Sequence, residues 1–268
     1  MLRSMYSGIS GMKGFQTKLD VIGNNIANVN TYGFKKGRVV FKDMVSQSVA
    51  GASAPGNGRG GTNPRQVGLG SQLAAIDTIQ TQGSTQTTYR PLDVAISGDG
   101  FLQVKDGNNT LYTRAGNLYL DKDGNLVNSD GLFIQGTTGT GTTVGNIKIP
   151  QTAKELSIGA DGKVTYTDDT GTLQTAGTIQ LAKFANPDGL MKVGNNLFEE
   201  TPNSGTITTA APGDKGTGVL VAGTLEMSNV DLSEEFTEMI VAQRGFQANT
   251  RIITTSDEIL QELVNLKR

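Results

Sequence analysis

The sequence predicts an α+β protein in which long N- and C-terminal helices pack as a coiled-coil-like pair, joined by an extended linker to a central antiparallel β domain. Two observations carry this prediction. Apolar residues recur at every seventh position near each terminus, and Asp-Gly pairs recur between short alternating segments in the middle. The expected division is 1–30 and 229–268 for the helices, 31–90 for an extended linker or arm, and 91–228 for the β domain.

The C-terminal helix is predicted over 231–268, a stretch without proline in which Gly245 is the only glycine. Asp231 is placed to cap the first turn, and the two glutamates that follow it suit the positive end of a helix dipole. A repeat of seven keeps one seam of a helix facing a partner helix. The seam residues that we expect to pack are Leu232, Phe236, Met239, Phe246, Ile253, Leu260 and Leu263.

The N-terminal helix is predicted over 1–30, with two apolar columns that each repeat at seven residues and lie three residues apart. Gly8 belongs to one column and allows two backbones to approach closely. The helix should end near residues 30–33, because Gly33 can take the left-handed conformation that terminates helices. The other members of the columns, which we expect to pack, are Met5, Met12, Phe15, Leu19, Ile22, Ile26 and Val29.

The two helices could form a self-contained hairpin, or they could pack against helices of other copies. Each buried Leu or Phe contributes about 1.5–3 kcal/mol. Ordering each of roughly seventy residues costs about 1–2 kcal/mol in backbone entropy, so one narrow seam leaves little surplus. We therefore expect ends that stay mobile in the free subunit and become ordered when many copies pack together.

Composition excludes several classes of protein. The 268 residues include no Cys and no His, which removes disulfides, thiol nucleophiles and the commonest general base and metal ligand. A net charge of −2 provides no basic footprint for nucleic acid. No window reaches the roughly 18 apolar residues of a membrane span, and the N-terminal helix lacks the cleavage site of a secretory signal peptide. We expect no cofactor, no metal, no nucleic acid and no membrane insertion.

Two segments of different character follow the first helix. Residues 34–41 carry three cations, Lys35, Lys36 and Arg38, which suit a solvated face or a subunit contact better than a phosphate or membrane patch. Residues 50–66 are rich in Gly and Pro, the composition of a flexible or extended loop. A structureless run of this length is unusual inside a compact domain, so a linker or arm is predicted.

From about Pro91 to Leu225 the sequence alternates between short apolar segments and turns. Six Asp-Gly pairs mark the turns: Asp99-Gly100, Asp106-Gly107, Asp123-Gly124, Asp130-Gly131, Asp161-Gly162 and Asp188-Gly189. Glycine accepts the positive φ that tight hairpins need. No alternation of strands with helices is present, so an antiparallel β domain is predicted.

Three patterns in this region resemble functional sites, but each lacks a feature that the site requires. Residues 121–125 resemble part of a calcium loop, but an EF-hand needs Gly at its sixth position and Glu at its twelfth, where Leu132 stands. The glycines of 139–145 precede a strand, so no helix N-terminus is placed to hold a phosphate. The carboxylate pairs 168–169 and 199–200 are adjacent residues, which point to opposite faces of a strand. We expect no catalytic residue and no enzyme.

Three motifs give the chain a family resemblance. They are Asn24-Asn25-Ile26-Ala27-Asn28 with Thr31-Tyr32-Gly33-Phe34-Lys35, then Leu92-Asp93-Val94-Ala95-Ile96 with Gly100-Phe101, then Ser228-Asn229-Val230-Asp231-Leu232 with Met239-Ile240-Val241-Ala242-Gln243-Arg244. In this order, and spread over nearly the whole chain, they resemble the axial proteins of the bacterial flagellum, the rod and hook subunits. The motif residues of the first helix and its end are Asn24, Asn25, Ala27, Asn28, Thr31, Gly33, Phe34 and Lys35.

Within this family, residues 31–35 and the ending Leu263-Val264-Asn265-Leu266 most resemble the hook protein in its short Gram-positive form. The best-known hook proteins carry an additional outer β domain, for which 268 residues leave no room. The length and the Gly/Pro-rich insertion resemble the distal rod protein. A hook subunit is therefore the first expectation, a distal rod subunit is the alternative, and a secreted β-rich binding module is the least favoured.

The resemblance implies a structural subunit that leaves the cell unfolded through the flagellar type III export apparatus, without a cleaved signal peptide. Copies would polymerise helically into a tube, with terminal helices lining the inner wall and β domains outside. As a hook, this tube would be a flexible joint that transmits motor torque from rod to filament. The implied partners are further copies, the rod and hook–filament junction proteins and the hook cap. The implied location is the extracellular flagellum, at the hook or basal body.

Overall fold

A computed structural model of the chain describes residues 2–55, 60–138 and 144–266. They form two compact units, which are described separately. The helical unit comprises Met1–Ala27, Gly37–Thr78 and Asp231–Arg268, and the β unit comprises Asn28–Lys36 and Ile79–Val230. The predicted class, α+β with terminal helices in contact and an antiparallel β domain between them in sequence, is confirmed. The segment predicted as one linker, 31–90, is divided between the two units.

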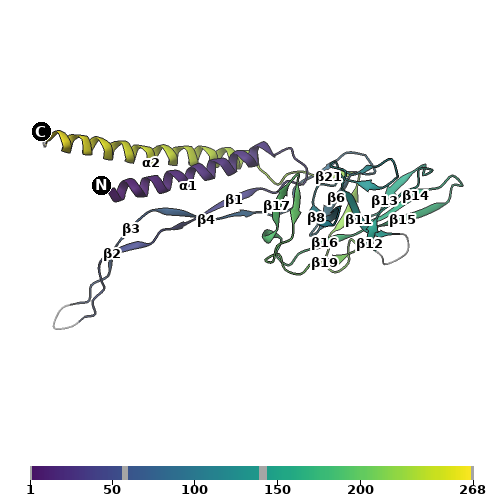
Figure 1. The fold of residues 1–268 in the computed structure, drawn as a ribbon, viewed down its shortest axis with the longest axis horizontal. Helices are drawn as coiled ribbons and strands as arrows, with labels where there is room; N and C mark the ends of the chain where they lie inside the picture. Colours follow the sequence, from purple (N-terminus) through teal and green to yellow (C-terminus); the bar gives the residue numbers. More distant parts are fainter. Residues whose placement is uncertain (1, 56–59, 139–143, 267–268) are drawn as a thin grey trace. The chain divides into compact units, whose positions relative to one another are not determined.

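The terminal helices of the helical unit lie side by side and run antiparallel (Figure 1). They are α1 (Leu2–Ala27) and α2 (Leu232–Leu266). The predicted cap of α2 is present, because the Asp231 carboxylate accepts hydrogen bonds from the backbone N–H groups of Ser233 at 2.8 Å and Glu234 at 3.4 Å. The first helix ends before the predicted 30–33, since a turn follows in which Thr31 N–H donates to the Asn28 carbonyl at 3.2 Å.

The chain between the helices contributes two strand pairs to the helical unit. β1 (Gly37–Asp43) pairs with β4 (Ser71–Thr78), and β2 (Ser46–Ala50) pairs with β3 (Arg65–Gly68), both antiparallel. The ring of Phe41 on β1 lies 6.3 Å from the ring of Phe15 on α1, so the first pair packs on α1. The β-leaning sequence of 34–41 overlaps β1. The sequence does not predict β2 and β3, because main-chain hydrogen bonds pair segments whose side chains are exposed.

The β unit consists of short antiparallel strands. Its main sheet follows the order β13-β14-β15-β11-β7-β8-β18-β17, with β9, β10, β12, β16 and β19 attached to this path. The strands are β5 (Thr85–Thr87), β6 (Val94–Ser97), β7 (Phe101–Asp106), β8 (Asn109–Thr113), β9 (Tyr119–Leu120), β10 (Leu126–Val127), β11 (Phe133–Thr138), β12 (Val144–Asn146), β13 (Leu156–Ile158), β14 (Lys163–Thr167), β15 (Leu173–Ile179), β16 (Leu181–Lys183), β17 (Met191–Gly194), β18 (Leu197–Glu199), β19 (Thr208–Ala210), β20 (Val219–Ala222) and β21 (Thr224–Glu226). β20 pairs with β6 and β21 with β5, so the last strands of the unit close on its first ones.

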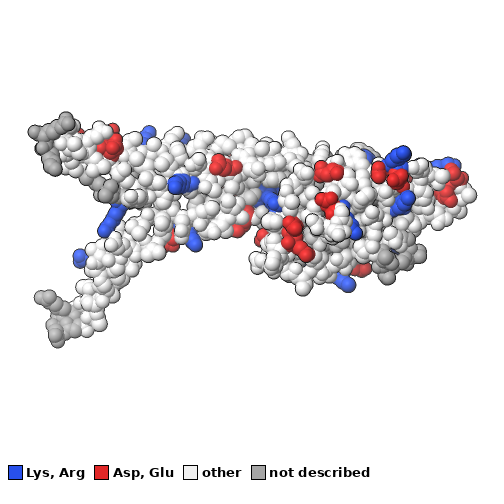
Figure 2. Space-filling view, in the orientation of Figure 1, with Lys and Arg blue, Asp and Glu red and all other residues white. Residues whose placement is uncertain are grey.

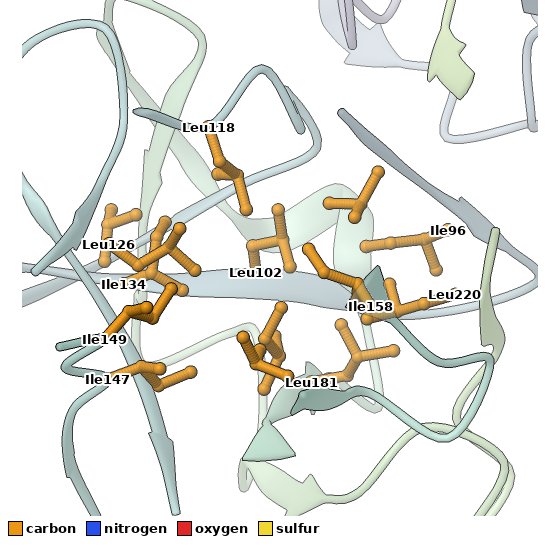
Figure 3. Packing of buried hydrophobic residues seen from close by; sticks show 14 of the residues in the cluster. Ile96, Leu102, Leu118, Leu126, Ile134, Ile147, Ile149, Ile158, Leu181 and Leu220 are labelled. Atoms are coloured by element: carbon orange, nitrogen blue, oxygen red, sulfur yellow. The ribbon is translucent and has the colours of Figure 1, made fainter. Parts of the chain in front are cut away.

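The core of the β unit lies between these strands. Leu102, Ile134 and Leu181 are fully buried and sit among branched aliphatic side chains that face one another (Figure 3). A second, aromatic cluster surrounds Phe101, whose ring meets Phe184 edge-on at 5.7 Å. Aliphatic and aromatic burial on this scale stabilises the β unit.

The Asp-Gly signals mark turns at five of the six predicted places. Gly100, Gly107, Gly124, Gly131 and Gly162 all have positive φ. Asp106-Gly107 joins the paired strands β7 and β8, as a hairpin requires. Asp188-Gly189 differs, because it lies in a 3-10 turn, η1 (Pro187–Gly189). Pro187 fixes the φ that begins a helical turn, so this pair is not a hairpin.

Alkaline pH is expected to destabilise the β unit through Tyr112, which is 3% exposed. Burial, and next the charge of Glu200, raises the pKa of Tyr112 from 10.0 to about 12. The unfolded tyrosine therefore ionises first, so the stabilisation is complete below pH 10 and is lost between about pH 10 and pH 12. Between these pH values, the unfolding free energy of Tyr112→Phe should fall by about 2 kcal/mol less than that of the wild type. Urea unfolding at stepwise pH measures both. Equal losses in both proteins would contradict this assignment.

Candidate assembly surfaces

The most deeply buried residues of α2 in the seam between the two helices are small or polar. Ala242, Ser256 and Glu235 are the buried residues of α2. Phe15 of α1 lies against Gly245, where an added Cβ would come within 2.6 Å of the ring. Since small residues let helix backbones approach, α2 offers a groove into which the apolar side chains of α1 fit.

Gly245→Ala is expected to destabilise the helix pair. Overpacking against Phe15 should lower the unfolding free energy by about 1–3 kcal/mol, and the higher helix propensity of alanine offsets part of this loss. Gly23→Ala in α1 is the matched control, because nothing lies within 4 Å of the Cβ position there. The control should stabilise the protein by about 0.5–1 kcal/mol. Thermal unfolding followed by circular dichroism at 222 nm measures both. The same sign of change in the two variants would refute the fit of Phe15 over Gly245.

The predicted seam residues fall into three groups. Ile22 is buried. Most of the others are half-buried: Met5, Met12, Phe15, Leu19, Ile26, Val29, Met239, Phe246, Ile253 and Leu260. Leu232, Phe236 and Leu263 are 40%, 50% and 49% exposed. Packing of these residues between copies stays a prediction, because the structure holds a single chain. Within that chain, α2 also turns a column that the sequence did not single out, Glu235, Ala242, Asn249 and Ser256, toward α1.

Several apolar side chains of α2 are exposed in the described single chain, and two groups of them lie near the ends of this helix. We call Leu232, Phe236 and Ile240, which recur every four residues, the outer stripe. The second surface is the α2 tail, Leu263, Val264 and Leu266, of which Leu266 is 83% exposed. Gly8 lies opposite Ile253 and Phe15 opposite Gly245, so the tail extends beyond the start of α1 (Figure 1). Charged side chains over the helices are few in the face shown in Figure 2.

Asn25, a motif residue, organises the helical unit. Its side-chain nitrogen donates to the Gly37 carbonyl at 2.9 Å and to a Glu235 carboxylate oxygen at 3.2 Å. Its side-chain oxygen accepts from the Gly37 N–H at 2.9 Å. With 2% exposure, Asn25 thus joins the end of α1, the start of β1 and the first turn of α2. A carboxamide is needed here because one group must both donate and accept.

A second motif residue, Lys35, forms a buried ionic cluster in the β unit, which we call the clasp: Lys35, Glu226 and Arg114. The Lys35 ammonium lies 2.6 Å from one Glu226 oxygen, and the Arg114 guanidinium lies 3.3 Å from the other. Gly83 N–H donates to Glu226 at 3.0 Å. Burial lowers the pKa of Lys35 and of Arg114, although the charge of Glu226 opposes this shift. The clasp joins chain segments that are far apart in the sequence.

Of the remaining motif residues, Gly33 contacts the clasp, and the others lie in the neighbouring sequence. Gly33 has φ +69°, the left-handed conformation predicted for it, and its N–H donates to the Glu226 carbonyl at 2.8 Å. A Cβ at this position would lie 2.7 Å from the Arg114 backbone, so only glycine fits. The Lys192 ammonium lies 5.0 Å from the Phe34 ring. The other motif residues, Asn24, Ala27, Asn28 and Thr31, are exposed or half-buried at the end of α1 and in the turn after it.

The three cations of 34–41 do not form one patch. Lys35 is buried, which corrects the prediction of a solvated or subunit-contacting face for this residue. Its partner Glu226 lies 191 positions away, so nearby sequence carries no sign of the ion pair. Arg38 is exposed and pairs with Asp77 of the neighbouring strand at 3.4 Å.

The rejected chemical patterns have structural roles where they are described. Asp121 N–H donates to the Asn125 carbonyl at 2.9 Å, so the calcium-like segment is a turn. Gly145 lies in β12, while Gly139 and Gly141 lie outside the described residues. Over the described ranges, no group of three His, Cys, Asp or Glu side chains could hold a metal ion. Neither described helix combines the length and apolar character needed to cross a membrane.

Comparison with known proteins relates the chain to a family. Residues 5–35 match the model described as flagella basal body rod protein, 95–166 match the flagellar hook protein FlgE/F/G D1 domain, and 221–266 match the flagellar basal body rod FlgEFG protein C-terminal region. The chain is 63% identical to the flagellar basal-body rod protein FlgG of Bacillus subtilis over all of both chains. The chain belongs to the flagellar rod and hook protein family.

Rod and hook members of this family are similar to the chain to different degrees. The basal-body rod protein FlgG of Caulobacter vibrioides is 38% identical over 99% of this chain and all of its own. The hook protein FlgE of Borreliella burgdorferi is 33% identical, and its alignment runs over 441 positions, so it carries long insertions relative to these 268 residues. The family consists of axial structural proteins, which confirms the expectation that the chain is not an enzyme.

Proposed function

We propose that the chain is a distal rod subunit of the flagellar basal body, whose copies stack helically into a straight, tubular drive shaft. The observation that carries this proposal is full-length identity of 63% with a basal-body rod protein. The hook reading, favoured by the motifs at 31–35 and 263–266, has weaker support. The hook protein of Borreliella burgdorferi aligns only with long insertions at 33% identity.

In this proposal the helical unit supplies the contacts between copies that build the tube. The outer stripe and the α2 tail are apolar surfaces that a single chain leaves exposed, and burying each such side chain is worth about 1.5–3 kcal/mol. Contacts between different surfaces of successive copies do not close, so they produce a filament rather than a ring. The predicted seam residues Leu232, Phe236 and Leu263 would then pack between chains.

The proposed location and partners follow from the same reading. The subunit would pass unfolded through the type III export apparatus and join the rod between the membranes or envelope layers that the rod crosses. Its neighbours would be copies of itself, other rod proteins and the first hook subunits. The β unit, with its own core, would face away from the axis of the tube.

Genetic complementation distinguishes the two axial roles. The gene is expressed in a Bacillus subtilis strain that lacks its own distal rod protein, and separately in one that lacks its hook protein. Restored motility and assembly in the first strain alone supports the distal rod. Rescue of only the second strain would overturn the proposal in favour of the hook. Electron microscopy of tubes grown from purified protein adds an independent result, since a rod is straight and a hook is curved.

A further inference from the structure

The β unit contains a cavity of about 180 Å³ to which the family assignment gives no role. It lies between the turn after β6 and the loop after β16. The residues that matter for its chemistry are Gln80, Asp99, Phe101, Arg114, Lys183 and Phe184. Two aromatic rings and a buried guanidinium thus line one small space.

The charges that line this cavity, taken with those of the clasp that adjoins it through Arg114, do not balance. The clasp places two cations, Lys35 and Arg114, around the single carboxylate of Glu226, and all three side chains are at most 5% exposed. Lys183, which also lines the cavity, lies 3.5 Å from the well-exposed carboxylate of Asp99. The five charged groups together leave an excess of one positive charge. A buried excess of this sign favours an anionic group in the adjoining space.

The hydrogen-bonding groups of the lining are also incomplete. Arg114 donates through one terminal nitrogen to Glu226 at 3.3 Å and through the other to the Gly98 carbonyl at 2.9 Å. Its buried Nε has no partner among the described residues, and neither has the buried Oε1 of Gln80. An unsatisfied buried polar atom costs about 1–3 kcal/mol. Rotating the Gln80 amide exchanges its oxygen for its nitrogen, after which Gln80 and Arg114 both present N–H donors.

We propose that this cavity is a binding site for a carboxylate group. The carboxylate would accept hydrogen bonds from Arg114 Nε and the Gln80 amide, with Lys183 beside it. Phe101 and Phe184 form apolar walls that exclude water and strengthen these charge-assisted bonds. The carboxylate could belong to a free small carboxylic acid or to an acidic side chain of a neighbouring copy. The second source depends on the proposed function, in which copies polymerise.

Titration of the monomeric full-length chain with sodium acetate tests the site. The readout is the Arg114 Nε–H signal in a nitrogen-15 correlation spectrum, with sodium chloride at equal ionic strength as the control salt. We expect a saturable shift with acetate alone. Asp99→Asn should tighten acetate binding about threefold, and Lys183→Gln should weaken it about threefold, through the changed charge at the cavity. Lys163→Gln removes an exposed lysine whose pair with Asp161 lies outside the cavity lining, and it should change nothing.

A shift that does not saturate, or that chloride reproduces, would mean that the cavity holds only water and would overturn the proposal. So would acetate affinities that are equal in the Asp99→Asn and Lys183→Gln variants. Because the titration uses monomers, this result is independent of whether tubes form. The source of the carboxylate is then identified from tube growth. Slower growth in acetate than in chloride identifies a neighbour's acidic side chain, and equal growth identifies a free acid.

Discussion

Phe236→Asp is expected to abolish the growth of tubes while leaving the free chain folded. Phe236 is 50% exposed in the single chain, so it contributes little to the pair of α1 and α2. Packed between copies it would contribute about 1.5–3 kcal/mol, and an unpaired carboxylate placed there adds a desolvation cost of similar size. Since about 1.4 kcal/mol is a factor of ten, the concentration needed for growth should rise by a factor of about a hundred or more.

The matched control is Thr237→Asp, which adds the same charge at the next, exposed position of α2. Its side chain lies on a different face of the helix, so tubes should grow nearly as in the wild type. Sedimentation and negative-stain electron microscopy measure growth, and circular dichroism reports the helices of the monomer. Normal tubes from Phe236→Asp would remove the outer stripe from the contact. Phe246 is half-buried within the single chain, so its substitution tests assembly less cleanly.

The existence of both helices could be predicted from their repeat of seven, but the small and polar residues that α2 buries against α1 could not. The predicted apolar seam of α2 includes Phe236, and the side chain of Phe236 is 50% exposed. The column that α1 covers contains Glu235, Ala242 and Ser256, which carry no hydrophobic signal. Close approach of backbones depends on small side chains, whereas hydrophobic periodicity weights large ones. A column of small residues at sevens is the signal that would have indicated this face.

Strands β2 and β3 of the helical unit and the clasp were beyond sequence reasoning for a different reason. β2 and β3 pair through their main chains while every one of their side chains is exposed, so no apolar alternation marks them. In the sequence, Lys35 resembles one of three surface cations. Its partner Glu226 lies beside it only in the folded β unit. Pairing over such a separation follows from the fold as a whole and leaves no local pattern.

Glu226→Gln is expected to have the largest effect on stability, a loss of about 3–5 kcal/mol in the β unit. The amide still offers an oxygen to Lys35 and Gly83, so the loss does not come mainly from missing contacts. It comes from leaving two buried cations, Lys35 and Arg114, without a compensating charge. Urea unfolding followed by tyrosine fluorescence measures the change. Asp169→Asn is the control, because its pair with Lys154 is about 60% exposed and worth at most about 1 kcal/mol.

Charge balance, rather than the number of contacts, predicts the order of the variants. Lys35→Met removes the shortest ion pair of the clasp, at 2.6 Å, yet it leaves one carboxylate opposite one guanidinium. It should therefore cost less than Glu226→Gln. Adding Lys35→Met to Glu226→Gln should restore part of the lost stability, because it removes one of the two uncompensated cations. A double variant less stable than Glu226→Gln alone would show that the contacts, and not the buried charge, determine the stability of the clasp.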